Sequence, residues 1–327
     1  MFFRYRAGGG EAGKLVFFRA CRQAHLLHTK NNRFDFFSCV DCLHARDEAA
    51  RLLAEQADLE NRPALDLTEL VKCRLAYLEL QNHVTMDRHQ QNSFRSIQER
   101  LTVGQLLLVM DFGMHQVKEK EESSSNRYAD LIFVFYWRGD DGVLEWEYVD
   151  CMAVMNDPLK NKKDLSFVET AFLSLIAEGR FLNTKELWIW SDCGPSHFRT
   201  SNTLYFFSQM QQVIKVKTTV CFFYPRHGHS AADRHHGSTK KHLKYVLKSL
   251  ADDYEIPNRD LLVRELEKCR FTTVQDLPPI ETHQKMVKTL AGIMEYLVFE
   301  FPEDVPSAVD CRRMFGGDIE RKRFDFC

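Results

Sequence analysis

No stretch of the sequence approaches the ~20 uninterrupted apolar residues that a membrane-spanning helix needs. The first residues, MFFRYRAGGGEAGKLVFF, contain too many arginines, glycines and glutamates for a secretory signal peptide. The ten cysteines are scattered over all 327 residues, without the density of a small disulfide-stabilised scaffold. We therefore expect a reduced globular protein of the nucleus or cytoplasm that is not secreted and does not enter a membrane.

The sequence also lacks a strong excess of positive charge. Its formal net charge of -2 contrasts with the basicity of many nucleic-acid-binding domains, which counts against constitutive DNA binding. Positive charge is nevertheless concentrated in one segment, which contains Arg226, His227, His229, Arg234, His235, His236, Lys240, Lys241, Lys244 and Lys248. If the chain binds DNA, we expect this segment to contact phosphates and the binding to weaken with salt.

Residues 1–100 are predicted to be mostly helical, with a loop around Asn31 and Asn32, a helix from about Ala45 and a second helix over 67–99. No internal repeat or long low-complexity tract interrupts this region. The pattern changes to strands at about residue 105. We therefore treat 1–100 as a separate helical N-terminal region.

A candidate zinc site lies in this N-terminal region. Cys39 and Cys42 form a Cys-x-x-Cys pair ahead of the first helix, and His83 and His89 lie in the second. Two thiolates and two imidazoles can hold a structural zinc ion tetrahedrally. The six-residue gap between the histidines requires either a helix break or only one histidine as ligand. Substitute ligands are Cys21, His25, His28, His44 and Cys73. Otherwise the two cysteines are ordinary buried thiols.

Residues 101–254 are predicted to form an α/β domain. Three strands joined by loops come first, which indicates an antiparallel meander; the charged, serine-rich stretch 118–126 and the turn 139–142 separate them. Strands then alternate with helices, which indicates parallel strands with crossover helices. The expected strands are 106–110, 131–137, 143–149, 186–190 and 217–224, and the expected helices are 165–177, 200–213 and 231–250. Residues 255–327 are predicted to be a helical tail without chemistry, broken at Pro278-Pro279 and at Pro302.

Three aspartates fall at the ends of these elements. Asp111 ends the first expected strand, Asp192 follows the fourth, and Asp233 lies early in the helix after the fifth. Two Mg²⁺ ions about 4 Å apart require hard oxygen ligands of this kind. Each aspartate alone has a simpler interpretation: Asp192 could form a turn, and Asp233 could pair with Arg234 or the lysines after it. A kinase-like role for Asp111 in DFG is dismissed, since no glycine-rich phosphate loop or HRD block accompanies it.

The blocks LLLVMDFG, LWIWSDCGPSHFRT and FFYPRHGHSAADRHHG, in this order, resemble the Asp–Asp–Asp core of cut-and-paste DNA transposases of the integrase superfamily. The resemblance covers about residues 105–250. It implies an RNase H-like mixed sheet and two Mg²⁺ ions, replaceable by Mn²⁺, held by Asp111, Asp192 and Asp233. Such transposases often carry a Cys-x-x-Cys and a distal histidine before the core, which favours the zinc hypothesis.

Other residues near these blocks are candidates for contacts with DNA. His229 could orient Asp233 or touch a phosphate, although it could equally be a turn histidine. His197 and Arg199 open the helix after Asp192, where a DNA backbone could meet a helix N-terminus, or they could simply be solvated. The complete expected nucleic-acid interface is His197, Arg199, Arg226, His229, Arg234, Lys240, Lys241 and Lys244.

The expected activity is metal-dependent DNA strand cleavage and strand transfer, with DNA as element ends and target and a homodimer as a further expectation. One alternative is a domesticated, catalytically decayed protein that only binds DNA; near-neutral charge, the absence of an evident helix-turn-helix and a start that could be a truncation favour it. Another is a hydrolytic nuclease of the same fold. A response to Mg²⁺ separates an intact site from a decayed one.

Overall fold

The computed structural model describes residues 40–61, 67–117, 126–154, 165–192, 198–224, 230–249, 259–278, 280 and 286–326. The chain divides into two compact units, Met1–Arg88 and His89–Cys327. The boundary between these units falls inside a helix, and the predicted boundary at residue 100 stays a prediction. None of the helices in the described part of the chain is long and apolar enough to cross a membrane.

The first unit contains helix α2 (Val40–Glu60) and most of α3 (Leu67–Arg100), which confirms the two predicted helical runs. The loop predicted around Asn31 lies outside the described residues. Cys73 is buried, and its Sγ donates a hydrogen bond of 2.8 Å to the carbonyl oxygen of Leu52. An ion pair also joins the two helices, since a guanidinium nitrogen of Arg74 lies 2.9 Å from Glu60 Oε1.

The second unit is an α/β domain with one mixed sheet, as predicted. Its nine strands lie in the order β6-β3-β2-β1-β4-β5-β7-β8-β9. β1 and β2 pair antiparallel, as do β2 and β3, whereas β4 is parallel to both β1 and β5. The strands are β1 (Gln105–Val117), β2 (Asn126–Arg138), β3 (Leu144–Val154), β4 (Glu186–Ser191), β5 (Lys217–Phe222), β6 (Thr272–Asp276), β7 (Val298–Glu300), β8 (Ala308–Arg312) and β9 (Glu320–Arg323).

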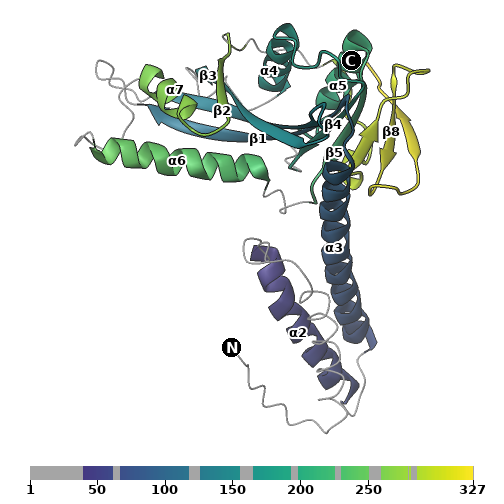
Figure 1. Cartoon of the computed structure of the whole chain (residues 1–327). Coiled ribbons are helices and arrows are strands. Elements are labelled where there is room, and N and C mark those ends of the chain that lie inside the picture. The colour runs from purple at the N-terminus through teal and green to yellow at the C-terminus, as the bar shows by residue number, and fades with distance from the viewer. Residues whose placement is uncertain are drawn as a thin grey trace. The chain divides into compact units, whose positions relative to one another are not determined.

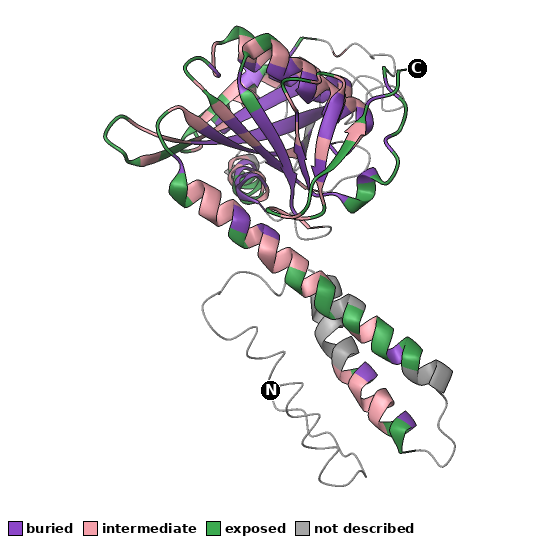
Figure 2. Ribbon diagram, turned by 90° about the vertical axis from the view of Figure 1, so that its right-hand side faces the viewer, coloured by how far each residue is buried: buried purple, intermediate pink, exposed green. Residues whose placement is uncertain are grey.

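Helices cover both faces of the central strands, as Figures 1 and 2 show. They are α4 (Leu165–Ala177), α5 (Ser201–Ile214), α6 (Ala231–Ser249) and α7 (Arg259–Glu267). On one face the ring of Phe133 packs against Phe172 of α4, with centroids 5.2 Å apart. On the other, Ile132 belongs to the same apolar cluster as Ala231 and Ala232 of α6. Because side chains alternate along a strand, odd-numbered and even-numbered positions of β2 meet different helices.

The apolar run from Leu107 to Met110 lies in the first half of β1, and all four residues have 0% exposure. An uninterrupted apolar run is typical of a strand with a packed layer on each face. β1 occupies this position, between β2 and β4 in the sheet. The sequence pattern and the place of the strand therefore agree.

β1 is longer than predicted, since it continues past Asp111 to Val117. The added half pairs with the start of β2, which also begins earlier than predicted, for example at His115↔Tyr128. This half of β1 could not be predicted from the sequence, because Gly113, His115 and Gln116 do not have a high strand propensity. Asp111 therefore lies within the strand and not at its end.

The prediction of a helical tail over 255–327 is wrong. α7 is the only α-helix in the described part of this region, and four short strands account for much of the rest. β6 pairs parallel to β3 at one edge of the sheet, and β7, β8 and β9 extend the sheet antiparallel beyond β5. Strands of three to five residues carry too little period-two pattern to be recognised in the sequence.

Candidate active site

Three elements of the second unit bring the predicted aspartates together. Asp111 lies in β1, Asp192 directly follows β4, and Asp233 lies in the first turn of α6. In the parallel register of β1 and β4, Met110 pairs with Ser191, so Asp111 and Asp192 occupy the next positions of neighbouring strands. α6 contacts β1, which brings Asp233 to the same place.

The pKa of Asp111 reflects the proximity of the two other carboxyl groups. Its pKa is raised to about 8, first by burial, then by the negative charges of Asp233 and Asp192, and by a hydrogen bond with Asp233. The backbone N–H of Phe112 donates to Asp111 Oδ1 at 2.7 Å and opposes the rise. Two carboxyl groups can share a hydrogen bond only while one holds a proton. Without a cation, the site therefore retains a proton where a free aspartate would have lost it.

Asp233 also caps its helix, a role that sequence reasoning missed. The Ser230 backbone N–H donates to Asp233 Oδ2 at 2.7 Å, and Ser230 Oγ accepts from the backbone N–H of Ala232 at 3.1 Å. The arrangement is similar to a capping box, in which the N-cap residue and the residue three positions later satisfy each other's backbone groups. The S-x-x-D spacing in the sequence could have predicted it. The cap fixes the position of the Asp233 carboxylate at the start of α6.

A second group of buried polar side chains lies on the same side of the sheet. His235 Nε2 lies 3.0 Å from Asp150 Oδ2, and its ring stacks on Tyr148 with centroids 3.9 Å apart. Burial and the charge of Asp130 raise the pKa of Asp150 to about 6, against the opposing effect of His235. His115 Nε2 lies 3.3 Å from Asp130 Oδ2. The polar face beneath α6 therefore extends well beyond the three predicted aspartates.

The prediction that Arg199 lies on a DNA-binding surface is wrong. Its side chain is buried at 2% exposure, its Nε donates to the Ile293 carbonyl oxygen at 3.2 Å, and its guanidinium lies over the ring of Phe222. Both contacts of the guanidinium come from segments that follow Arg199 by more than twenty residues. Its burial could therefore not be predicted from the neighbouring sequence. His197, Arg226 and His229 lie outside the described residues.

The remaining predicted basic residues lie on α6 and are exposed: Arg234, Lys240, Lys241, Lys244 and Lys248. Intervals of seven residues separate Arg234, Lys241 and Lys248, and Lys244 lies between the last two. Residues at this spacing share one side of a helix. We call these five side chains the α6 basic stripe. It is available to a partner of negative charge.

The zinc hypothesis is not decided by the described residues. Cys39 and the side chain of Cys42 lie outside them, as do the substitutes Cys21, His25, His28 and the side chain of His44. α3 is continuous through His83 and His89, so no helix break brings these two side chains together. His89 Nε2 also contacts the Phe315 carbonyl oxygen at 2.7 Å. At most one of the two histidines can therefore join the cysteine pair.

Comparison with known families gives a match to a family whose function is unknown, over a range that contains β1 to β6. Residues 90–291 match the profile of a family described as a domain of unknown function, DUF8701, and this match covers more than half of the chain. The chain belongs to that family. No curated protein matches the sequence significantly. The matched residues include all three aspartates, together with β1, β4 and α6.

Proposed function

We propose that the second unit is a metal-dependent DNA strand-cleaving and strand-transferring core of the RNase H-like, transposase type. The observation that carries the proposal is the convergence of Asp111, Asp192 and Asp233, from two strands and a helix, on one interacting group. Three separate sequence motifs predict the same three residues.

The order and direction of the central strands support the same proposal. β3, β2 and β1 form an antiparallel meander, and β4 and β5 follow parallel to β1. This is the strand order expected of an RNase H-like fold, with one acidic residue on β1, one after β4 and one on the helix after β5. The additional strands at both edges leave that centre unchanged.

The three carboxyl groups fit a pair of Mg²⁺ or Mn²⁺ ions. Their mutual repulsion, which helps to raise the pKa of Asp111 to about 8, is the interaction that divalent cations relieve. Aspartate oxygens are the hard ligands that Mg²⁺ prefers. When bound, two such ions activate an attacking oxygen and stabilise the leaving oxygen of a phosphodiester. The convergence also favours an intact site over a decayed one.

Hydrogen bonds within the chain position two of the carboxyl groups. The capping contact with Ser230 fixes Asp233, and the backbone N–H of Phe112 fixes one oxygen of Asp111. The α6 basic stripe lies on the helix that carries Asp233, where it can hold a phosphate backbone near the carboxylates.

Asp192→Asn tests the proposal. It keeps the size of the side chain and removes its charge, so we expect Mg²⁺-dependent nicking of labelled DNA to fall to the level of the reaction without metal. Asp140→Asn is the matched control, because Asp140 is exposed in the turn between β2 and β3. Joining of a 3′-hydroxyl end to target DNA, measured in the same reactions, separates a transposase from a hydrolytic nuclease. Full activity of the Asp192→Asn protein would remove the assignment.

A further inference from the structure

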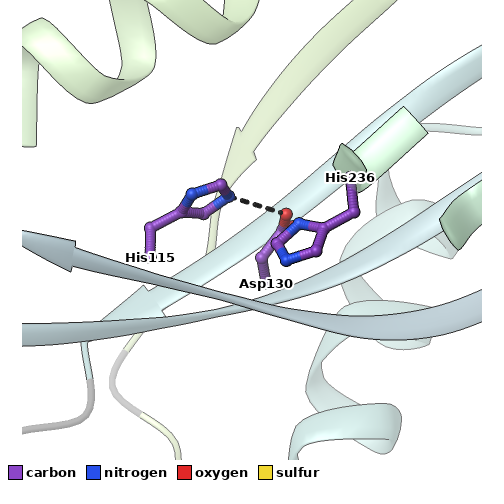
Figure 3. Close-up of side chains that lie close together, drawn as sticks. All are labelled: His115, Asp130 and His236. Carbon is purple, nitrogen blue, oxygen red and sulfur yellow. Dashed lines mark hydrogen bonds and ion pairs between the residues drawn. The ribbon is translucent and has the colours of Figure 1, made fainter. Parts of the chain in front are cut away.

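Three metal-binding side chains meet beside the proposed active site but are not part of it. His115 comes from β1, Asp130 from β2 and His236 from α6 (Figure 3), and one donor atom of each lies within 4.8 Å of the other two. His115 and Asp130 are 3% and 0% exposed, and His236 is half-buried. The rings of the two histidines lie edge to face, with centroids 5.1 Å apart.

The pairing of β1 and β2 builds this group. Gly113 pairs with Asp130, and His115 follows two positions later on the same face of β1. A side chain at Gly113 would occupy the space that His236 uses, because a Cβ there would lie 2.7 Å from Cε1 and Nδ1 of its ring. The glycine therefore lets the α6 histidine approach the sheet.

The donor set suits a divalent transition metal. Imidazole nitrogens and a carboxylate oxygen are ligands of Zn²⁺, and imidazole also suits Co²⁺ and Ni²⁺. A tetrahedral ion with bonds of about 2.0 Å separates its donors by roughly 3.3 Å. His115 Nε2 and Asp130 Oδ2 lie 3.3 Å apart, so this pair needs no rearrangement. The donor atom of His236 lies within 4.8 Å of the other two.

An independent observation concerns the other oxygen of Asp130. Asp130 Oδ1 is buried and has no hydrogen-bond partner among the residues that the structure describes. A buried carboxylate oxygen without a partner is costly, and a bound cation removes this cost. As a second oxygen of the same carboxylate, it can also supply a fourth donor to the ion.

We propose that His115, Asp130 and His236 bind one Zn²⁺ or similar transition-metal ion. The ion connects α6 to β1 and β2 at a point one helical turn after Asp233, so it holds the start of α6 against the strand that carries Asp111. This site goes beyond the proposed function, because it includes two imidazole donors and its role does not depend on the reaction catalysed.

Co²⁺ binding to the full chain tests the site. The protein carries Cys39→Ser and Cys42→Ser to remove the other candidate zinc ligands, is freed of metal with a chelator, and is titrated in excess Mg²⁺ to occupy oxygen-only sites. We expect one Co²⁺ per chain, with visible bands of low coordination number, no thiolate band in the near ultraviolet, and displacement by Zn²⁺. Failure of this protein to bind Co²⁺ or Zn²⁺ would overturn the proposal.

Matched histidine variants locate the ion. His236→Gln is expected to weaken binding more than about 100-fold, since even outer-shell partners contribute about 10- to 100-fold. His242→Gln is the control, because His242 lies on the same helix and pairs with Glu265. Equal binding by the two variants would refute the assignment. Gly113→Ala, which pushes the His236 ring aside, should weaken binding as well.

X-ray absorption at the zinc edge gives a result that does not depend on any variant folding. The zinc-loaded protein with the two cysteine replacements should show nitrogen and oxygen ligands with the scattering of two imidazoles. A zinc environment without imidazole scattering would contradict the site. Asp192→Asn should leave the zinc content unchanged, so failure of this inference and failure of the proposed enzyme activity are distinguishable.

Discussion

Burial and the repulsion of neighbouring carboxyl groups act together on Asp111 in the proposed active site. It is partly buried in β1, beside two other carboxyl groups, and its pKa is about 8 compared with an ordinary value of 3.8. The folded chain therefore holds this proton more tightly than the unfolded chain does. Its contribution to the free energy of unfolding is fully present below about pH 4 and is lost as pH rises to about 8.

Asp111→Asn removes this dependence, because an amide cannot ionise. In the absence of metal we expect the variant to melt at least a few degrees (~2–4 °C per kcal/mol) above the wild type at pH 8, with the difference shrinking toward pH 4. Thermal melts of both proteins across this pH range provide the measurement. Asp140→Asn should follow the wild type, and Mg²⁺ should stabilise only proteins that retain Asp111. Parallel pH profiles of Asp111→Asn and wild type would be inconsistent with the raised pKa of Asp111.

The sequence could predict Asp111, Asp192 and Asp233, but not the buried group around Asp130. Each of the first three follows an apolar run or opens a helix, where a local pattern identifies it. Asp130 lies among apolar residues, and its approach to His115 depends on the register of two strands. The histidines of α6 were counted only as positive charge, although His235 faces inward and pairs with Asp150.

α6 combines three roles on different sides of one helix. Asp233 lies in its first turn, His235 and Thr239 are buried on its inner side, and the α6 basic stripe lies on its exposed side. A period of 3.6 residues separates these sides. The sequence predicted the helix to within one residue of its end, but its inner histidines become visible only once the sheet beneath it is known.

Neutralising part of the α6 basic stripe should weaken DNA binding through salt-dependent contacts. For Lys241→Gln, Lys244→Gln and Lys248→Gln combined, we expect the slope of log affinity against log salt to fall by roughly 0.9 for each lysine that contacts a phosphate. Fluorescence anisotropy with labelled duplex DNA at several salt concentrations measures this slope. The matched control replaces three exposed lysines of other elements: Lys185, Lys215 and Lys288. Equal slopes for the two triple variants would exclude the stripe as the phosphate contact.

For the molecule as a whole, sequence patterns predicted the centre of the sheet better than its edges. The five central strands and their three helices lie where the alternation of patterns placed them, with β1, β2 and β3 extended. The outer strands β6 to β9 come from a region that was expected to be helical. Short edge strands are stabilised by pairing with the rest of the sheet. The local sequence of such a strand contains little information about that pairing.

The positions of the three carboxyl groups depend on several elements of the second unit. Asp111 and Asp192 depend on the β1–β4 register, and Asp233 depends on the packing of α6 against β1 and β2. No single motif contains the site. Binding of divalent ions between these three side chains is therefore the central property of the proposed active site.

Anomalous diffraction from crystals soaked in Mn²⁺ decides this question. We expect two peaks about 4 Å apart, bounded by the carboxyl groups of Asp111, Asp192 and Asp233. A single peak at His115, Asp130 and His236 would support the transition-metal site alone. Absence of any peak between the three aspartates, at Mn²⁺ concentrations that saturate the protein, would contradict the proposed active site.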